Sequence, residues 1–107
     1  MKGDIVLVPF PFSDKKGKKV RPACVLGDDG RDATLAFISS VIDNNGPYDL
    51  KLKPTKTNNL KKESVLKVSK LATLSRRIII GKVGSVSKKD VTSIDRLLIK
   101  YFQILAK

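Results

Sequence analysis

Histidine is absent from this sequence of 107 residues, and cysteine occurs only once. A single cysteine cannot form an internal disulfide, and without histidine the usual zinc-binding sets cannot be assembled. The same absences exclude Ser-His-Asp and Cys-His nucleophiles, together with acid–base catalysis by histidine. We therefore expect neither a metal nor a cofactor, and any catalysis must rest on other side chains.

Long apolar runs are also absent. No run approaches the roughly 18 residues that a membrane span needs, and the start of the chain, with Asp4, has no signal-peptide pattern. We therefore expect a cytoplasmic protein with no membrane partner. Cys24 lies in an apolar stretch, where a small buried hydrophobic side chain is the favoured interpretation over a reactive thiol.

Acidic residues are scarce, with 10 Asp and Glu against 22 Lys and Arg, which gives a formal net charge of +12. Such an excess points to a polyanionic partner, either a nucleic acid or an acidic protein segment. A lysine-coated surface that serves only solubility is the alternative. The length suits one domain, and no linker or internal repeat interrupts the chain, so we expect a single domain over residues 1–107.

Runs of β-branched and aliphatic residues, separated by turn residues, predict strands along most of the chain. The Asn-Gly step within residues 44–47 is a hairpin signal, so we expect a hairpin between the strands on either side of it. The predicted strands cover residues 5–10, 22–27, 34–42, 49–53, 64–71 and 78–83.

A helix is predicted near residues 88–105. Ser87 with an acidic residue three positions later forms an acceptable capping box, and apolar residues then recur at helical spacing. Ile94, Leu98 and Phe102 should be buried on its apolar stripe. The fold class is therefore mainly β with one α-helix: a bent sheet of five to six or more short strands, closed into a small barrel against which the helix packs.

Arg21 and Ser39 are the candidates for chemistry. Arg21 precedes a proline, which favours extended backbone, so its guanidinium is held on a strand end as a planar fork for phosphate. If the strands of Arg21 and Ser39 share a sheet, the pair could stabilise a phosphorane and orient an RNA 2′-hydroxyl. Two alternatives stay open: Arg21 pairs with Asp4 or Asp14 in an ion pair, or Ser39 is only a structural hydroxyl.

The opening pattern Lys-Gly-Asp-Ile-Val-x-x-x-Phe-Pro-Phe-Ser-Asp, followed by Arg-Pro-Ala-x-Val-Leu at residues 21–26, resembles the MazF/PemK toxins of type II toxin–antitoxin systems. Residues 63–66, 70–74 and 79–84 resemble later segments of that family, in the same order. The resemblance implies an SH3-like barrel, a homodimer, and an acidic cognate antitoxin that blocks the site. It also implies metal-independent cleavage of single-stranded RNA, which leaves a 2′,3′-cyclic phosphate and a 5′-hydroxyl.

The resemblance places the functional arginine of the family on Arg21 and its strand hydroxyl on Ser39, as the catalytic residues. The Arg-Thr-hydrophobic-Asp turn of several members reads Ala-Thr-Leu-Ser at residues 72–75, without either charged residue. No general base is evident, since Glu63 is the only glutamate. The expected RNA-binding residues are Phe12, Lys16, Lys18, Lys19, Ser40, Lys70 and Thr73.

Two other functions compete with an RNA-cleaving toxin. A toxin that inhibits DNA gyrase, as the related CcdB proteins do, should carry a terminal segment specialised for gyrase, and residues 103–107 show no obvious one. A non-enzymatic basic barrel that binds nucleic acid would fit the Lys-Gly-Asp opening. It fits Arg21-Pro22 and the C-terminal helix less well.

Overall fold

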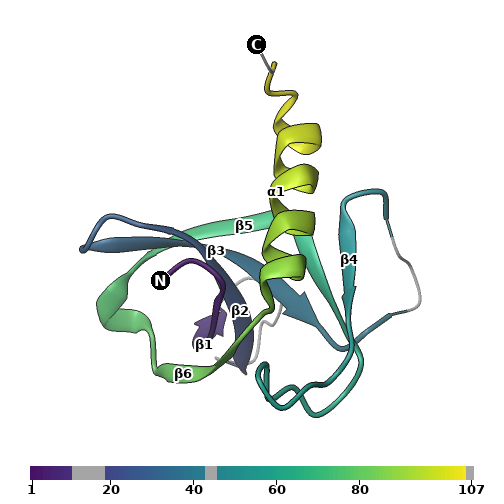
Figure 1. The fold of residues 1–107 in the computed structure, drawn as a ribbon. Helices are drawn as coiled ribbons and strands as arrows, with labels where there is room; N and C mark the ends of the chain where they lie inside the picture. The colour runs from purple at the N-terminus through teal and green to yellow at the C-terminus, as the bar shows by residue number, and fades with distance from the viewer. Residues whose placement is uncertain (11–18, 43–45, 106–107) are drawn as a thin grey trace.

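The computed structural model describes residues 1–10, 19–42 and 46–105 (Figure 1). Six strands are followed by one long helix, and a short 3₁₀ helix, η1 (Arg76–Ile78), lies between the last two strands. The strands are β1 (Asp4–Phe10), β2 (Lys19–Asp28), β3 (Asp32–Ser39), β4 (Asp49–Leu52), β5 (Ser64–Ser75) and β6 (Gly81–Ser85), and the helix is α1 (Lys88–Phe102).

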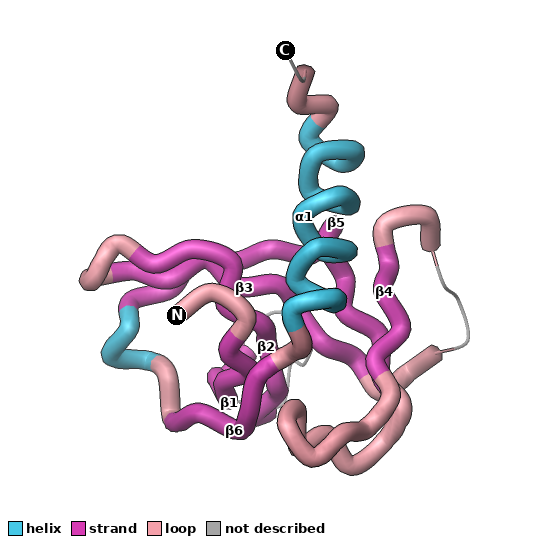
Figure 2. Tube along the Cα trace, viewed as in Figure 1, coloured by secondary structure: helices cyan, strands magenta, loops and turns pink. Residues whose placement is uncertain are grey.

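The six strands form one antiparallel sheet in the order β4-β5-β3-β2-β1-β6, which curls around itself (Figure 2). The expected hairpin between the third and fourth strands is wrong, because β5 lies between β3 and β4. A turn signal reports only local preference, whereas β5 is twelve residues long and offers β3 eight paired positions. Residues 44 and 45 of that signal lie outside the described residues.

Two strand boundaries differ from the prediction for local reasons. The third strand ends at Ser39 rather than at residue 42, and Val41 beyond it is 65% exposed. Residues 78–80 are β-branched but not in a strand, because the Ser75 hydroxyl accepts a hydrogen bond from the Arg77 amide at 3.3 Å and starts η1. The sixth strand begins only at Gly81.

Helix α1 packs on one face of the sheet through Ile94, which is 1% exposed and joins the cluster that contains Ile5 and Leu66. Leu98 is partly buried there, but Phe102 is 54% exposed, so its predicted burial is wrong. The last turn of α1 projects beyond the sheet (Figure 1). The helix ends there because Gln103 is left-handed (φ 54°) and its amide donates to the last carbonyls.

A second apolar cluster lies on the other face of the sheet and includes Val8, Ala23, Leu35 and Phe37. Cys24 points instead into the helix-side cluster, where it is fully buried, as predicted. Burial, with a smaller contribution from nearby Asp4, raises the pKa of the Cys24 thiol to about 12. The cysteine is therefore a core residue and stays protonated at neutral pH.

The loop between β4 and β5 joins the two ends of the sheet order and so completes the barrel. The Ser85 amide of β6 donates to the Thr57 carbonyl at 3.0 Å, and the Asn59 side chain donates to the Val83 carbonyl at 2.8 Å. A Cβ on Gly84 would lie 2.4 Å from the Thr57 oxygen, so this approach requires glycine. Among the described helices, none is long and apolar enough to span a membrane.

Candidate active site

The register of β2 and β3 brings Arg21 and Ser39 together. Ala23 pairs with Phe37, and Arg21 and Ser39 each lie two residues beyond this pair, at the same end of the two strands. Both side chains line one pocket of about 290 Å³, as the sequence predicted for strands of one sheet. The residues that line this pocket are Arg21, Phe37, Ile38, Ser39, Val41, Lys67 and Lys70.

Within the described residues, the Nε donor of Arg21 has no hydrogen-bond acceptor. The same atom is shielded from solvent. Asp4, one proposed partner, instead pairs with the N-terminal amine at 3.3 Å and with Lys82 at 3.2 Å, while Asp14 lies outside the described residues. Because a buried unpaired donor costs free energy, this arrangement favours an incoming anion at Arg21.

The Ser39 hydroxyl has a local structural role and also faces the pocket. Its oxygen accepts a hydrogen bond from the Val41 amide at 3.1 Å, which turns the chain at the end of β3. A serine hydroxyl can donate one hydrogen bond while its oxygen accepts another. Ser39 can therefore hold the turn and still donate to a substrate in the pocket.

Two lysines enter the pocket through an irregularity in β5. Ala36 pairs with Leu71 but its neighbour Phe37 pairs with Lys67, so β5 has extra residues at this point and the register shifts. Bulges of this kind re-aim side chains and are common beside active sites. The shift lets both Lys67 and Lys70 line the pocket, whereas strict alternation would assign residues three apart to opposite faces.

Lys67 is the charged residue of the described pocket lining that sequence reasoning missed. Its ammonium pairs with Asp49 of β4 at 3.1 Å, and Asp49 is almost fully buried. The alternation of residues 64–68 indicated a strand but carried no signal for a charge held by a partner on another strand. Among the described residues that line the pocket there is no carboxylate, histidine or cysteine. Within the described residues there is also no cluster of three or more potential metal ligands.

The remaining predicted RNA-binding residues lie outside this pocket or outside the described residues. Lys19 of β2 and Ser40, which follows β3, are exposed and do not line the pocket. Thr73 lies further along β5, where its hydroxyl shares a 2.8 Å hydrogen bond with Thr34 of β3. The three residues that the structure does not describe are Phe12, Lys16 and Lys18.

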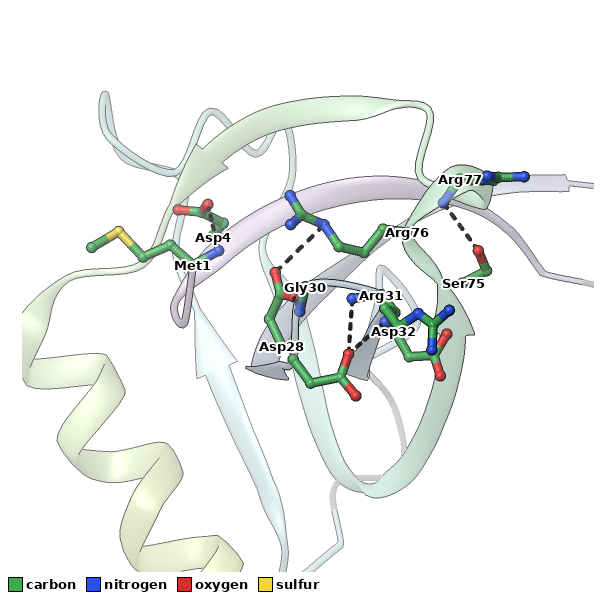
Figure 3. A network of polar contacts seen from close by, with 10 residues as sticks. Met1, Asp4, Asp28, Gly30, Arg31, Asp32, Ser75, Arg76 and Arg77 are labelled. Atoms are coloured by element: carbon green, nitrogen blue, oxygen red, sulfur yellow. Dashed lines mark hydrogen bonds and ion pairs between the residues drawn. The ribbon is translucent and has the colours of Figure 1, made fainter.

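A second pocket, of about 380 Å³, lies at the other end of β3 and β5 and is lined by Arg31, Arg76 and Arg77 among others. Figure 3 shows that carboxylates accompany these arginines: Asp28 pairs with Arg76 at 3.6 Å. Asp29 accepts hydrogen bonds from the amides of residues 31 and 32. Of the three arginines here, Arg76 has a carboxylate partner, whereas Arg21 Nε has no partner within the described residues.

Comparison with known proteins gives the family of the chain. The family described as PemK-like, MazF-like toxin of type II toxin-antitoxin system matches residues 1–102. The chain belongs to this family. A MazF relative in Mycolicibacterium smegmatis, named a probable endoribonuclease, is 29% identical over 92 residues, which cover 80% of this chain and 83% of that protein.

Solved MazF structures share the fold. The toxin MazF-mt6 of Mycobacterium tuberculosis has a TM-score of 0.79 at 14% identity, covering 96% of this chain and 99% of that one. MazF of Deinococcus radiodurans has a TM-score of 0.75 at 16% identity, covering 96% of each chain. A mycobacterial endoribonuclease solved with its cognate antitoxin has a TM-score of 0.79 at 11% identity, covering 100% and 98%. The predicted fold class is confirmed.

Proposed function

We propose that this MazF-family chain is a toxin that cleaves single-stranded RNA through attack of the 2′-hydroxyl on the neighbouring phosphate. The observation that carries the proposal is the shielded Nε of Arg21, which has no partner in the described part of the chain and lies in a pocket that also contains Ser39 and two lysines. Such a pocket suits a phosphodiester. The name of the M. smegmatis relative, a probable endoribonuclease, supports the same activity.

In this reaction the O2′–P bond forms and the P–O5′ bond breaks. The products are a 2′,3′-cyclic phosphate and a 5′-hydroxyl, and the proton lost by the 2′-oxygen is balanced by one gained from solvent at the 5′-oxygen. Arg21 donates to the non-bridging oxygens, where charge accumulates in the phosphorane. Ser39 donates to the same phosphate or orients the 2′-hydroxyl. We propose no metal in any step, because the described lining is cationic and supplies no carboxylate ligand for one.

The test uses purified protein, excess chelator and single-stranded RNA, with the product ends identified. We expect cleavage with 2′,3′-cyclic phosphate ends, and no cleavage of a matched oligonucleotide with 2′-deoxyribose at the cut site. Loss of activity in chelator, or cleavage of the deoxy substrate, would overturn the mechanism. Stable RNA binding without cleavage of any sequence would favour the non-enzymatic alternative.

The partners follow from the same pocket and charge. We propose an acidic antitoxin segment as the inhibitor, because the net charge of +12 attracts it as it attracts RNA. The mycobacterial neighbour solved with its cognate antitoxin supports this assignment. We also propose a homodimer and a cytoplasmic location. A bound antitoxin peptide should compete with RNA, and unchanged RNA affinity in its presence would mean that inhibition acts from another surface.

A further inference from the structure

Lys67 is held in the pocket by a buried carboxylate. Its Nζ lies 3.1 Å from Asp49 Oδ2, and the two residues are directly opposite in the pairing of β4 with β5. The Asp49 side chain is only 6% exposed, and the same oxygen accepts a hydrogen bond from the Gly46 amide at 2.8 Å. Two donors therefore fix this carboxylate, and the carboxylate in turn fixes the position of the ammonium.

The ammonium of Lys67 retains capacity for a ligand. A lysine ammonium has three donors, of which the contact with Asp49 uses one. The Lys67 side chain is 21% exposed and lines the pocket beside Arg21 and Ser39. Phe37, opposite Lys67 on β3, is two residues before Ser39, so Lys67 and Ser39 belong to the same face of the sheet.

Fold stability alone is a weak explanation for this ion pair. Taking a lysine and an aspartate out of water carries a desolvation cost that their attraction often only offsets, and apolar residues of similar size would cover the sheet as well. The position of Lys67 also matters. Among the described residues, Arg21, Lys67 and Lys70 give the pocket more positive charge than Asp49 balances, which suits more than one phosphate of a nucleic acid.

We propose that Lys67 is an RNA-binding residue that contacts a phosphate in this pocket, and that Asp49 is the positioning residue that holds it there. The proposal rests on the proposed function, since it assigns two further residues to the same site. Neither residue belongs to the sequence patterns that indicated an RNA site. Arg21 acts on the phosphate that reacts, and Lys67 binds that phosphate or the adjacent one.

The direct test measures affinity for an RNA oligonucleotide with 2′-deoxyribose at the cut site, over a range of salt concentrations. Lys67→Met should weaken binding about 10-fold, as expected for losing a hydrogen bond to a charged group. It should also reduce the slope of log affinity against log salt by about 0.7, the value for one phosphate of a single strand. Lys89→Met, an exposed lysine on α1 across the sheet from the pocket, is the matched control and should leave the slope unchanged.

A double-mutant cycle tests the positioning role of Asp49. Asp49→Asn should weaken RNA binding in the wild-type background but add little once Lys67 is methionine, because the carboxylate acts through the ammonium. Lys67→Arg should restore part of the affinity. If Asp49 only supports the fold, its substitution weakens binding equally in both backgrounds. Urea unfolding shows whether each variant is folded. If the Lys67→Met variant does not fold, Lys67→Gln replaces it, because glutamine keeps a hydrogen-bond donor for Asp49.

The outcomes separate this inference from the proposed function. If the wild-type protein neither binds nor cleaves any RNA, the proposed function is wrong. If wild-type protein binds and cleaves RNA while Lys67→Met matches Lys89→Met in affinity and salt slope, the assignment of Lys67 is wrong and the function stands. If the effects of the two substitutions on RNA affinity are additive in the cycle, only the positioning role of Asp49 is wrong.

Discussion

Arginines line a pocket at each end of the paired strands β3 and β5, but their hydrogen-bond partners differ between the two ends. At one end, where Ser39 pairs with Val65, Arg21 lies in a pocket, and its Nε has no partner among the residues that the structure describes. At the other end, where Asp32 pairs with Ser75, arginines line a pocket of comparable volume. Seven residues of extended β3 separate the ends, or about 23 Å at 3.3 Å per residue.

The difference is one of hydrogen-bond and charge balance rather than of arginine content. At the Asp32 end the carboxylates of one turn pair with one arginine and with backbone donors: Asp28 pairs with Arg76, and Asp29 accepts from two amides. At the Ser39 end Asp49 balances Lys67 but nothing in the described residues satisfies Arg21 Nε. The carboxylates at the first end therefore stabilise a turn, and the second end is suited to an external anion at Arg21.

The largest expected effect on RNA cleavage comes from replacing an arginine by alanine, and we compare one arginine from each end. Arg21→Ala should reduce the single-turnover rate of RNA cleavage by about 100–1,000-fold, the cost of losing an oxyanion donor. Arg76→Ala should cleave RNA at close to the wild-type rate, because its guanidinium is already committed to Asp28. An Arg21→Ala protein as fast as wild type, or an Arg76→Ala protein that is equally impaired, would break the comparison.

A smaller effect is expected from the hydroxyl groups of the two ends. Ser39→Ala should slow cleavage by about 2–10-fold, as for the loss of one neutral hydrogen bond, and therefore less than Arg21→Ala. Thr73→Ala should leave the rate unchanged, because the Thr73 hydroxyl already bonds to Thr34. The cleavage rates of the two variants are measured at saturating RNA. A Thr73→Ala variant slower than Ser39→Ala would show that the substrate reaches the far end of β5.

Sequence reasoning located the strands and the Arg21–Ser39 pair because both depend on local pattern. Alternation and turn residues predict strands, and two side chains near facing strand ends meet once those strands are neighbours. The pairing of β4 with β5 was not accessible in this way, because it depends on which distant strand offers more partners. Lys67 was missed for the same reason: its partner Asp49 and the register shift in β5 are long-range features.

The C-terminal helix shows a similar limit. Helical spacing correctly predicted α1 and the burial of Ile94, since the periodicity of side chains is a local property. It could not predict where the sheet stops, so Phe102 was assigned to the core although it lies beyond it. The charge of the chain likewise indicated a polyanionic partner but not which arginines remain available for one. That distinction requires the positions of the carboxylates.

The smallest expected effect concerns the turn end alone and depends on pH. Hydrogen bonds from the backbone amides of Asp32 and then Arg31 hold the pKa of Asp29 below its ordinary value of 3.8. The ionised carboxylate is therefore favoured in the folded state. Its contribution to stability is present above the unfolded pKa and is lost as the pH falls through the folded pKa. Asp29 is fully exposed, so solvent screening keeps the effect small.

Asp29→Asn isolates this contribution, because the amide keeps an oxygen acceptor for the two backbone donors but does not titrate. The free energy of unfolding, measured by urea at about pH 7 and about pH 3, should fall less with acidification in the variant than in wild type. RNA cleavage at neutral pH should be unchanged, since Asp29 lies at the end of β3 remote from Arg21. Equal acid sensitivity of the two proteins would show that the hydrogen bonds to Asp29 do not stabilise the turn. A loss of cleavage at neutral pH would instead make the turn end part of the RNA site.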